Sequence, residues 1–130
     1  MKVLLVEDDP VDAMLVTEAL KGAGIDDVVR AESGEAALDR LGARSDLVML
    51  LDVRLPGLSG HDVLARLRER GVTAPVVMMS SSTRDEDIAA AYRNGAAAYF
   101  KKPADIDAYS EVAEAVRRTW FSAGLSQRPR

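Results

Sequence analysis

Cysteine is absent from this sequence of 130 residues, and histidine occurs once, at His61. The lack of cysteine excludes disulfide bonds and thiolate metal sites. Because His61 has no second histidine or cysteine beside which to bind a metal, we interpret it as a solvated side chain at a helix start. No apolar run approaches the ~18 residues that a membrane-spanning helix needs. An apolar strand begins at once, which leaves no room for a signal peptide, and we expect a cytoplasmic protein without a membrane partner.

Positive charge is also scarce. Lys and Arg number 17 against 21 Asp and Glu, for a net charge of −4. A nucleic acid is therefore not the expected partner, since binding to its phosphates needs a basic surface. The basic residues near the carboxyl end, Arg117–Arg118 and Arg128–Arg130, are interpreted as a solvated end of the chain. Hydrophobic residues make up 48% and charged residues 29%, as is typical of a single globular domain.

Short apolar runs alternate with segments of helical spacing. The expected strands are residues 3–6, 28–31, 46–53, 75–79 and 96–100. The expected helices are residues 10–22, 35–41, 62–70, 84–94 and 106–120, four of them capped by Asp9, Ser33, Thr83 and Asp105. In the first helix we expect the buried side to consist of Val11, Met14, Leu15 and Leu20. This alternation predicts one α/β domain with a parallel sheet over residues 1–121, followed by a polar, disordered tail at 122–130 and no output domain.

The stretch from Leu50 to Gly57 is the most informative part of the sequence. An apolar run there is typical of a strand buried on both faces, and Asp52 lies where that strand reaches its carboxyl end. Burying a charge is costly without a partner, so Asp52 is not packing material. This stretch alone leaves two interpretations open. The side chain either caps the turn at Pro56–Gly57 or serves a function.

Polar side chains follow three other expected strands. They are Glu7, Asp8 and Asp9 after the first, Ser80 and Ser81 after the fourth, and Lys102 after the fifth. Ligands of open parallel sheets bind at these carboxyl ends, and Asp8 and Asp52 must converge if the first and third strands are neighbours. For Asp9 the preferred interpretation is a helix cap.

Converging carboxylates repel one another unless a cation lies between them. An oxygen-only set selects a hard ion, and Mg²⁺ suits a site with few carboxylates. A lysine and a hydroxyl at the same sheet edge would complete a pocket for a tetrahedral dianion. A nucleophilic carboxylate, a divalent cation, an ammonium and a hydroxyl are the groups that phosphoryl transfer to an aspartate requires.

Taken together, the motifs resemble the receiver domain of two-component response regulators over residues 2–120. The resemblance is carried by Glu7–Asp8, Asp52 with Leu55–Gly57, Ser80–Ser81, and the stretch from Gly95 through Tyr99 to Lys102–Pro103. It implies a doubly wound, flavodoxin-like (βα)5 fold with the strand order 2-1-3-4-5. It also implies a single-domain regulator that accepts a phosphoryl group on Asp52 from a sensor histidine kinase, and that is not an enzyme beyond catalysing its own phosphorylation and dephosphorylation.

The family pattern implies a metal site in which Asp8 binds Mg²⁺. Glu7, Asp52 and the backbone carbonyl of Arg54 are the other expected ligands. The long, basic side chain of Arg54 stands at a position that tunes dephosphorylation in this family, which leaves the lifetime of the phosphoryl group open. Ser59 replaces a more usual acidic or amide residue without affecting the chemistry.

The same pattern implies roles around the phosphoryl group. Ser80, in place of the commoner threonine, would hydrogen-bond it, Lys102 would pair with it, and the small Ser81 would leave a route for the donor or for water. The bond between Lys102 and Pro103 is expected to be cis. Tyr99 is expected to be a switch whose ring follows Ser80 inward, and a plain core tyrosine is the alternative.

Finer features resemble the stand-alone regulators that are paired with bacterial phytochromes. They include Glu7–Pro10, Glu86–Ile88 and Thr119–Phe121. A bacterial phytochrome is therefore the candidate kinase. We also expect a homodimer through the face of the fourth and fifth helices, because Tyr92, Trp120 and Phe121 fall there, with packing inside the domain as the alternative.

Two other functions are weighed against this one. Haloacid-dehalogenase-like phosphatases also use a strand-end aspartate, but they need a second aspartate two residues later, where this chain has Arg54. They also carry a cap domain that the chain lacks. A receiver-like domain that only binds partners would be missing a site residue, and none is missing here.

Overall fold

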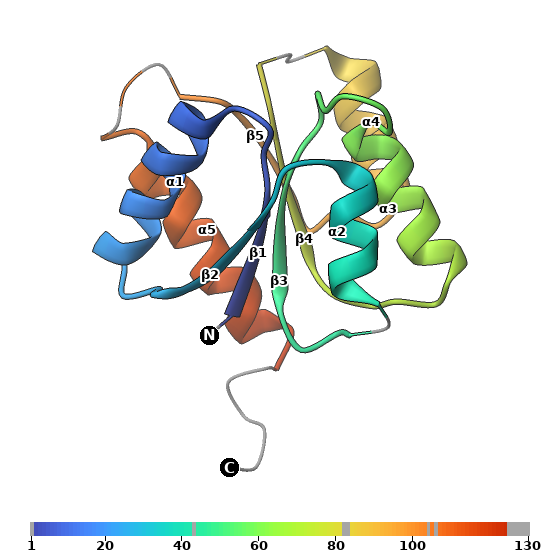
Figure 1. The fold of residues 1–130 in the computed structure, drawn as a ribbon, viewed down its shortest axis with the longest axis horizontal. Coiled ribbons are helices and arrows are strands. Elements are labelled where there is room, and N and C mark those ends of the chain that lie inside the picture. Colours follow the sequence, from blue (N-terminus) through green and yellow to red (C-terminus); the bar gives the residue numbers. More distant parts are fainter. Residues whose placement is uncertain (1, 43, 82–83, 104, 106, 125–130) are drawn as a thin grey trace.

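The computed structural model describes residues 2–42, 44–81, 84–103, 105 and 107–124. Within these residues, five strands alternate with five helices (Figure 1). The strands are β1 (Lys2–Val6), β2 (Asp27–Ala31), β3 (Val48–Asp52), β4 (Val76–Ser80) and β5 (Ala98–Lys101). The helices are α1 (Pro10–Gly22), α2 (Gly34–Leu41), α3 (Gly60–Glu69), α4 (Asp85–Arg93) and α5 (Tyr109–Ser122). No helix in this described part of the chain combines the length and the apolar character that crossing a membrane demands.

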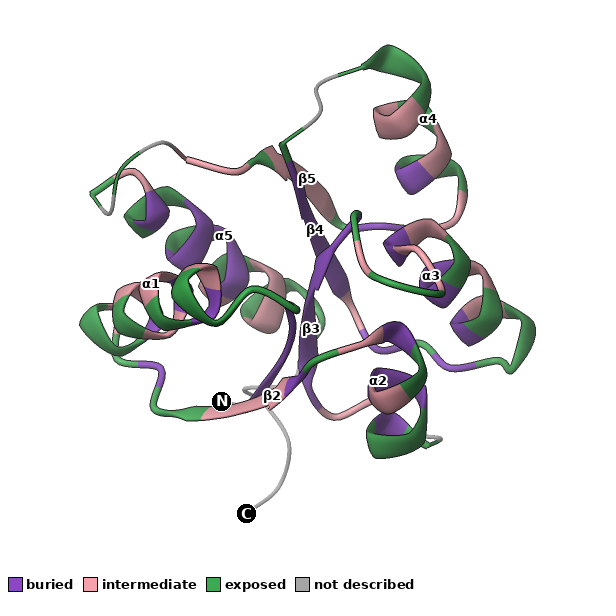
Figure 2. Ribbon diagram, turned by 45° about the horizontal axis from the view of Figure 1, so that its top comes forward, coloured by how far each residue is buried: buried purple, intermediate pink, exposed green. Residues whose placement is uncertain are grey.

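The strands form one parallel sheet in the order β2-β1-β3-β4-β5, which confirms the predicted fold. Helices α1 and α5 cover one face of the sheet, and α2, α3 and α4 cover the other (Figure 1). Successive side chains of β3 alternate between these faces, with Leu50 packing toward α1 and α5 and Leu51 toward the other three helices. Because both faces are covered, β3 and β4 are buried throughout (Figure 2) and are apolar up to the polar residue that ends each of them.

The start of α1 agrees with the prediction, and its buried side agrees only in part. Asp9 caps the helix, because its Oδ1 accepts hydrogen bonds from the backbone N–H groups of Val11 at 2.9 Å and Asp12 at 3.5 Å. Val11 and Met14, however, are 58% and 57% exposed. The residues that the helix buries against the sheet are Ala13, Val16 and Leu20, of which Leu20 was predicted. The predicted Leu15 is partly buried against the same side of the core. The buried set has the spacing of one helical face, and residues 11 and 14 point away from it.

Other element boundaries differ from the predictions by a few residues. Helix α3 begins at Gly60, two residues early, because Ser59 and Asp62 form a capping box. Strand β3 begins at Val48, two residues later than predicted. Ser33 caps α2 as predicted, since its Oγ accepts a hydrogen bond from the backbone N–H of Ala36 at 3.1 Å.

The two last helices start differently from the predictions. Helix α4 has Arg84 at its N-cap, without a side-chain hydrogen bond, and the predicted cap Thr83 lies outside the described residues. Helix α5 begins only at Tyr109, because Asp105 Oδ1 accepts a hydrogen bond from the backbone N–H of Ala108 at 3.0 Å and closes a turn before the helix. The helix continues to residue 122, and positions 125–130 of the predicted tail lie outside the described residues.

Gly60 brings α3 close to the end of β3. Its backbone N–H donates a hydrogen bond to the carbonyl oxygen of Val53 at 2.8 Å. A Cβ atom at this position would clash with the backbone of Asp52 and Val53. Only glycine therefore permits the loop between β3 and α3 to fold back this tightly over the strand end.

His61, in the first turn of α3, is not the solvated side chain that we predicted. Its side chain is only 22% exposed, and its Nε2 lies 3.7 Å from Asp87 Oδ1 in α4. The first turns of the two helices meet at this pair. The burial follows from tertiary packing between α3 and α4, which the local sequence pattern does not show.

Candidate functional site

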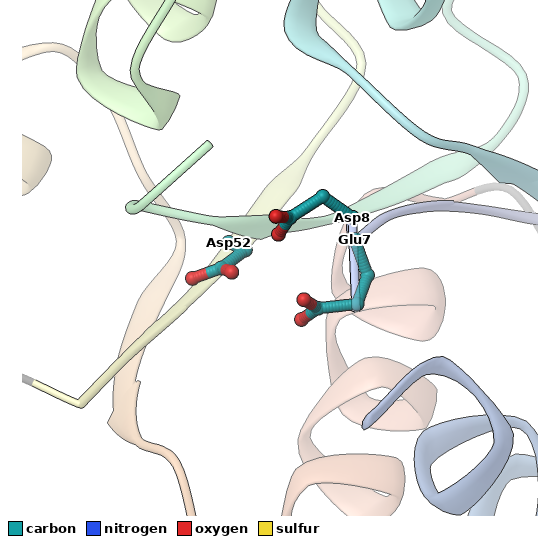
Figure 3. A group of neighbouring side chains, drawn as sticks. All are labelled: Glu7, Asp8 and Asp52. Carbon is teal, nitrogen blue, oxygen red and sulfur yellow. The ribbon is translucent and has the colours of Figure 1, made fainter. Parts of the chain in front are cut away.

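Three carboxylates gather at the carboxyl ends of β1 and β3. Val6 pairs with Leu51 across these neighbouring strands, so the residues that follow β1 lie level with Asp52, the last residue of β3. Glu7, Asp8 and Asp52 each place one carboxylate oxygen within 4.8 Å of the others. Figure 3 shows the three side chains of this group. Glu7 and Asp52 are 0% and 2% exposed, whereas Asp8 faces solvent. The predicted convergence of the first and third strand ends is confirmed.

Burial makes the Glu7 carboxylate difficult to ionise. Desolvation raises the pKa of Glu7 from 4.5 to about 7, and the nearby Asp52 carboxylate adds to this increase. The hydrogen bond from Lys102 acts in the opposite direction and limits the increase in pKa. The site therefore contains a carboxyl group that gains or loses a proton near neutral pH.

Lys102 brings a positive charge into this acidic cluster. Its Nζ lies 2.8 Å from Glu7 Oε2, 3.0 Å from Asp52 Oδ2 and 3.1 Å from Asp12 Oδ2. Burial alone disfavours the ammonium form, but hydrogen bonds to Glu7 and Asp52 outweigh it and raise the pKa of Lys102. The lysine is therefore charged at any physiological pH. It reaches the site from the residue that follows β5, the edge strand at the opposite end of the sheet from β2.

The predicted cis peptide bond is wrong. The described part of the chain has no cis bond, so the bond from Lys102 to Pro103 is trans. Trans is favoured for a bond before proline by about 0.5–1 kcal/mol, and no cis bond is needed to direct the lysine inward. The backbone does this instead, because the Lys102 N–H donates a hydrogen bond to the carbonyl oxygen of Ser80 at 2.8 Å.

The acidic segment after β1 is held by its backbone. Arg30, in β2, donates from Nε to the carbonyl oxygen of Glu7 at 3.0 Å and from Nη2 to that of Asp8 at 3.1 Å. The N–H of Asp9 donates to Glu7 Oε1 at 3.2 Å. At the other strand end, the backbone N–H of Arg54 donates to Asp52 Oδ1 at 3.2 Å. The Arg30 contacts hold the backbone of this segment, and the other two contacts hold the carboxylates of Glu7 and Asp52.

The remaining predicted residues lie around this cluster at different depths. Ser80 ends β4 and is fully buried, one residue beyond the partner of Asp52 in the strand register. Ser81 follows it and is exposed. Tyr99, in β5, is half-buried and packs against the core on the side of α2, α3 and α4. Tyr99 pairs with Met78, so it lies two positions before Ser80 along the neighbouring strand.

Asp12 and Arg30 are site residues that the sequence did not reveal. Asp12 reads as an ordinary acidic residue in the first turn of a helix, and Arg30 as a half-exposed residue of an edge strand. Their partners lie 90 residues and more than 20 residues away, respectively. Their roles follow from the strand order, which local spacing does not encode.

The donor set fits a hard divalent cation. Its side-chain ligand atoms are all carboxylate oxygens, a class of ligand that Mg²⁺ prefers. The Lys102 nitrogen, 2.8 Å from Glu7 Oε2, is an ammonium, which cannot bind a metal. A cation at this point would offset the repulsion between Glu7, Asp8 and Asp52. The arrangement combines a buried carboxylate with a place for positive charge and with a fixed ammonium, and these are groups that phosphoryl transfer to an aspartate requires.

Comparisons with known proteins give matches to this chain in both sequence and fold. The family model of the response regulator receiver domain matches residues 3–114. The two-component response regulator ORR41 of Oryza sativa subsp. japonica is 41% identical over 107 residues, which cover 79% of this chain and 84% of that one. The crystal structure of the phosphorylated cyanobacterial phytochrome response regulator RcpA superposes with a TM-score of 0.79 at 29% identity, over 94% of both chains. The Mn²⁺-bound form of response regulator Rcp1 gives 0.76 at 27% identity, over 92% of this chain and 94% of that one.

Proposed function

The chain belongs to the response regulator receiver domain family, and we propose that it accepts a phosphoryl group on Asp52 from a sensor histidine kinase. One observation carries this proposal. The Asp52 carboxylate is buried at a strand end, within 4.8 Å of oxygens of Glu7 and Asp8 and 3.0 Å from the ammonium of Lys102. A carboxylate in this setting can act as a nucleophile, and the nearby ammonium can neutralise the charge of the phosphoryl group that it accepts.

We assign the roles around Asp52 as follows. An oxygen of Asp52 attacks the phosphorus of a phosphohistidine, so an O–P bond forms while the N–P bond to the kinase breaks. Asp8, Glu7, Asp52 and the carbonyl of Arg54 would hold Mg²⁺, which when bound draws charge from the phosphoryl oxygens. The similar structure of response regulator Rcp1 is a Mn²⁺-bound form, which supports the binding of a divalent cation.

Lys102 and Ser80 would then hold the product. Lys102 pairs with a phosphoryl oxygen, and the Ser80 hydroxyl donates a hydrogen bond to another. Ser81, exposed beside them, leaves the donor or an attacking water a path to the site. Together these contacts stabilise the acyl phosphate without serving a further substrate, so the domain catalyses only its own modification.

A phosphatase of the haloacid dehalogenase type is the second candidate, and the structure argues against it. Such an enzyme needs a carboxylic acid two residues after the nucleophile, where this chain has the exposed side chain of Arg54. A module that merely binds partners is the third. It does not explain why a buried acidic cluster, a costly feature, is kept together with an inward-pointing lysine.

The signal is proposed to leave through the face of α4, β5 and α5. Moving a two-state surface from 1:99 to 99:1 needs about 5.5 kcal/mol of preference, to which the added phosphoryl charge and its hydrogen bonds contribute. In this scheme Ser80 moves toward the phosphoryl group and the half-buried Tyr99 turns inward. Tyr92 and Phe121 are 50% and 53% exposed, and we propose that they join two copies of the chain in a homodimer.

We further propose that the kinase is a bacterial phytochrome and that the exchange takes place in the cytoplasm. Support for the phytochrome comes from the similarity to RcpA, a cyanobacterial phytochrome response regulator. A purified phytochrome kinase that transfers phosphoryl groups to this chain faster than unrelated sensor kinases do would support the pairing. Equal rates with all kinases would reject it.

The phosphoacceptor proposal is tested by incubation with Mg²⁺ and acetyl phosphate, followed by intact mass measurement. We expect one phosphoryl adduct in the native protein, none in Asp52→Asn, and one in Asp39→Asn, the control, which alters an exposed aspartate in α2. Turnover of phosphate esters without an adduct would instead establish the phosphatase. Light scattering with and without beryllofluoride tests the dimer, and a monomer in both conditions would reject it.

A further inference from the structure

Asp12 contacts the catalytic lysine but stands outside the three-carboxylate group. It lies in the first turn of α1, and its Oδ2 is 3.1 Å from Lys102 Nζ. Lys102 forms ion pairs with Asp12, Glu7 and Asp52 at nearly equal distances. Of these three carboxylates, only Asp12 is absent from the group whose oxygens converge within 4.8 Å.

This difference matters when the acidic group takes up a divalent cation. The ammonium of Lys102 lies within hydrogen-bond distance of two of the carboxylates that the cation would use, so the two positive charges compete for them. Asp12 offers the displaced ammonium a carboxylate of its own. Because its side chain is 31% exposed and lies on a neighbouring element, it can hold the lysine at the edge of the site.

We propose that Asp12 is the positioning residue for Lys102, which keeps the ammonium beside Asp52 while a divalent cation occupies the acidic group. The inference rests on the proposed function, because it concerns the lysine that pairs with the phosphoryl group. Asp12 itself touches neither the cation nor the phosphoryl group and acts only through Lys102. Without it, the lysine stays on Glu7 and Asp52 and obstructs cation binding, and once saturating Mg²⁺ displaces it, it turns away into solvent.

The first experiment compares rates. Asp12→Asn keeps the size of the side chain and removes its charge, and Glu18→Gln on the same helix removes an equally negative side chain that contacts Lys21 instead. With acetyl phosphate and saturating Mg²⁺, Asp12→Asn should lower the maximal phosphorylation rate about tenfold and leave the KM for the donor unchanged. Glu18→Gln should stay within roughly twofold of the native rate, and Asp12→Glu should recover most of the loss. A native rate in Asp12→Asn would overturn the proposal.

The second experiment needs no phosphodonor. The Mg²⁺ dissociation constant is measured by calorimetric titration for the native protein, Asp12→Asn, Lys102→Gln and the double variant. Asp12→Asn should weaken Mg²⁺ binding about fivefold in the native background, and should have no more effect than Glu18→Gln once Lys102 is gone. Equal weakening in both backgrounds means that Asp12 acts as a bulk charge and overturns the proposal. If the native chain accepts no phosphoryl group, the proposed phosphoacceptor function fails, while this cycle still decides the link between Asp12 and Lys102.

Discussion

The pKa of Glu7 leads to a quantitative prediction about stability and pH. In the unfolded chain the carboxyl group has its ordinary pKa of 4.5, and burial raises the pKa to about 7 in the folded protein. Between these values the folded state binds a proton that the unfolded state has released. Stability therefore falls as pH rises from 4.5 to 7, and the full loss, about 3 kcal/mol, persists above pH 7 in the absence of a divalent cation. Lys102, whose pKa is raised, loses its contribution only above its ordinary value of 10.5, outside this window.

The assay is urea unfolding between pH 5 and pH 8.5 in the presence of a chelator. Trp120, the single tryptophan, is partly buried against the α1–α5 side of the core and reports the transition by fluorescence. The native protein should lose about 2.5 kcal/mol across this range relative to Glu7→Gln, which has no charge to desolvate, because part of the full loss already occurs below pH 5. Glu18→Gln, altered at an exposed site, should follow the native curve. Parallel curves for the native protein and Glu7→Gln would refute the argument.

Mg²⁺ provides the complementary half of this test. At pH 8, an Mg²⁺ concentration a hundredfold above the dissociation constant of the native protein should raise its free energy of unfolding by about 2.7 kcal/mol, because the ion binds only the folded state. Glu7→Gln is measured at the same Mg²⁺ concentration. The increase should be smaller in Glu7→Gln, which has lost one carboxylate of the converging group. An equal increase in both proteins would show that Glu7 takes no part in holding the ion.

Three further outcomes are expected. Lys102→Gln removes the hydrogen bond that limits the pKa of Glu7, so the pH-dependent loss of stability should move to higher pH, as the same urea series would show; an unchanged midpoint would mean that the contact is not formed in solution. Gly60→Ala should lower the free energy of unfolding by about 3 kcal/mol, because the new Cβ clashes with the backbone of Asp52. Thermal or urea unfolding measures this loss, and a native-like melting temperature would contradict the close approach of α3 to β3. Arg30→Gln should lower the free energy of unfolding by about 2 kcal/mol, because its hydrogen bonds to the carbonyls of Glu7 and Asp8 are lost. Arg40→Gln, which alters an exposed arginine, should change stability little, and equal effects of the two substitutions would contradict the assigned contacts.

Much of the fold followed from patterns that are local in the chain. The apolar runs at β3 and β4, the Asp9 and Ser33 caps and the alternation of elements each depend on neighbouring residues. The buried side of α1 followed only in part, because the exposed Val11 and Met14 are as apolar as the residues that the sheet covers. Which face of a helix meets the sheet depends on how the helix is placed, and hydrophobicity alone does not decide between two apolar sides.

The candidate site divides in the same way. The sequence alone predicted which polar residues lie at the strand ends, because a parallel sheet brings its carboxyl ends to one edge. These residues are Glu7, Asp8, Asp52, Ser80 and Lys102. Only the tertiary structure decided that Asp12 meets Lys102 across 90 positions, that Arg30 holds the acidic segment, and that the lysine needs no cis bond. Local spacing in the sequence specifies which groups reach the sheet edge. The distances between these groups depend on how side chains from different strands pack together. Those distances determine the pKa of Glu7 and the partners of Lys102.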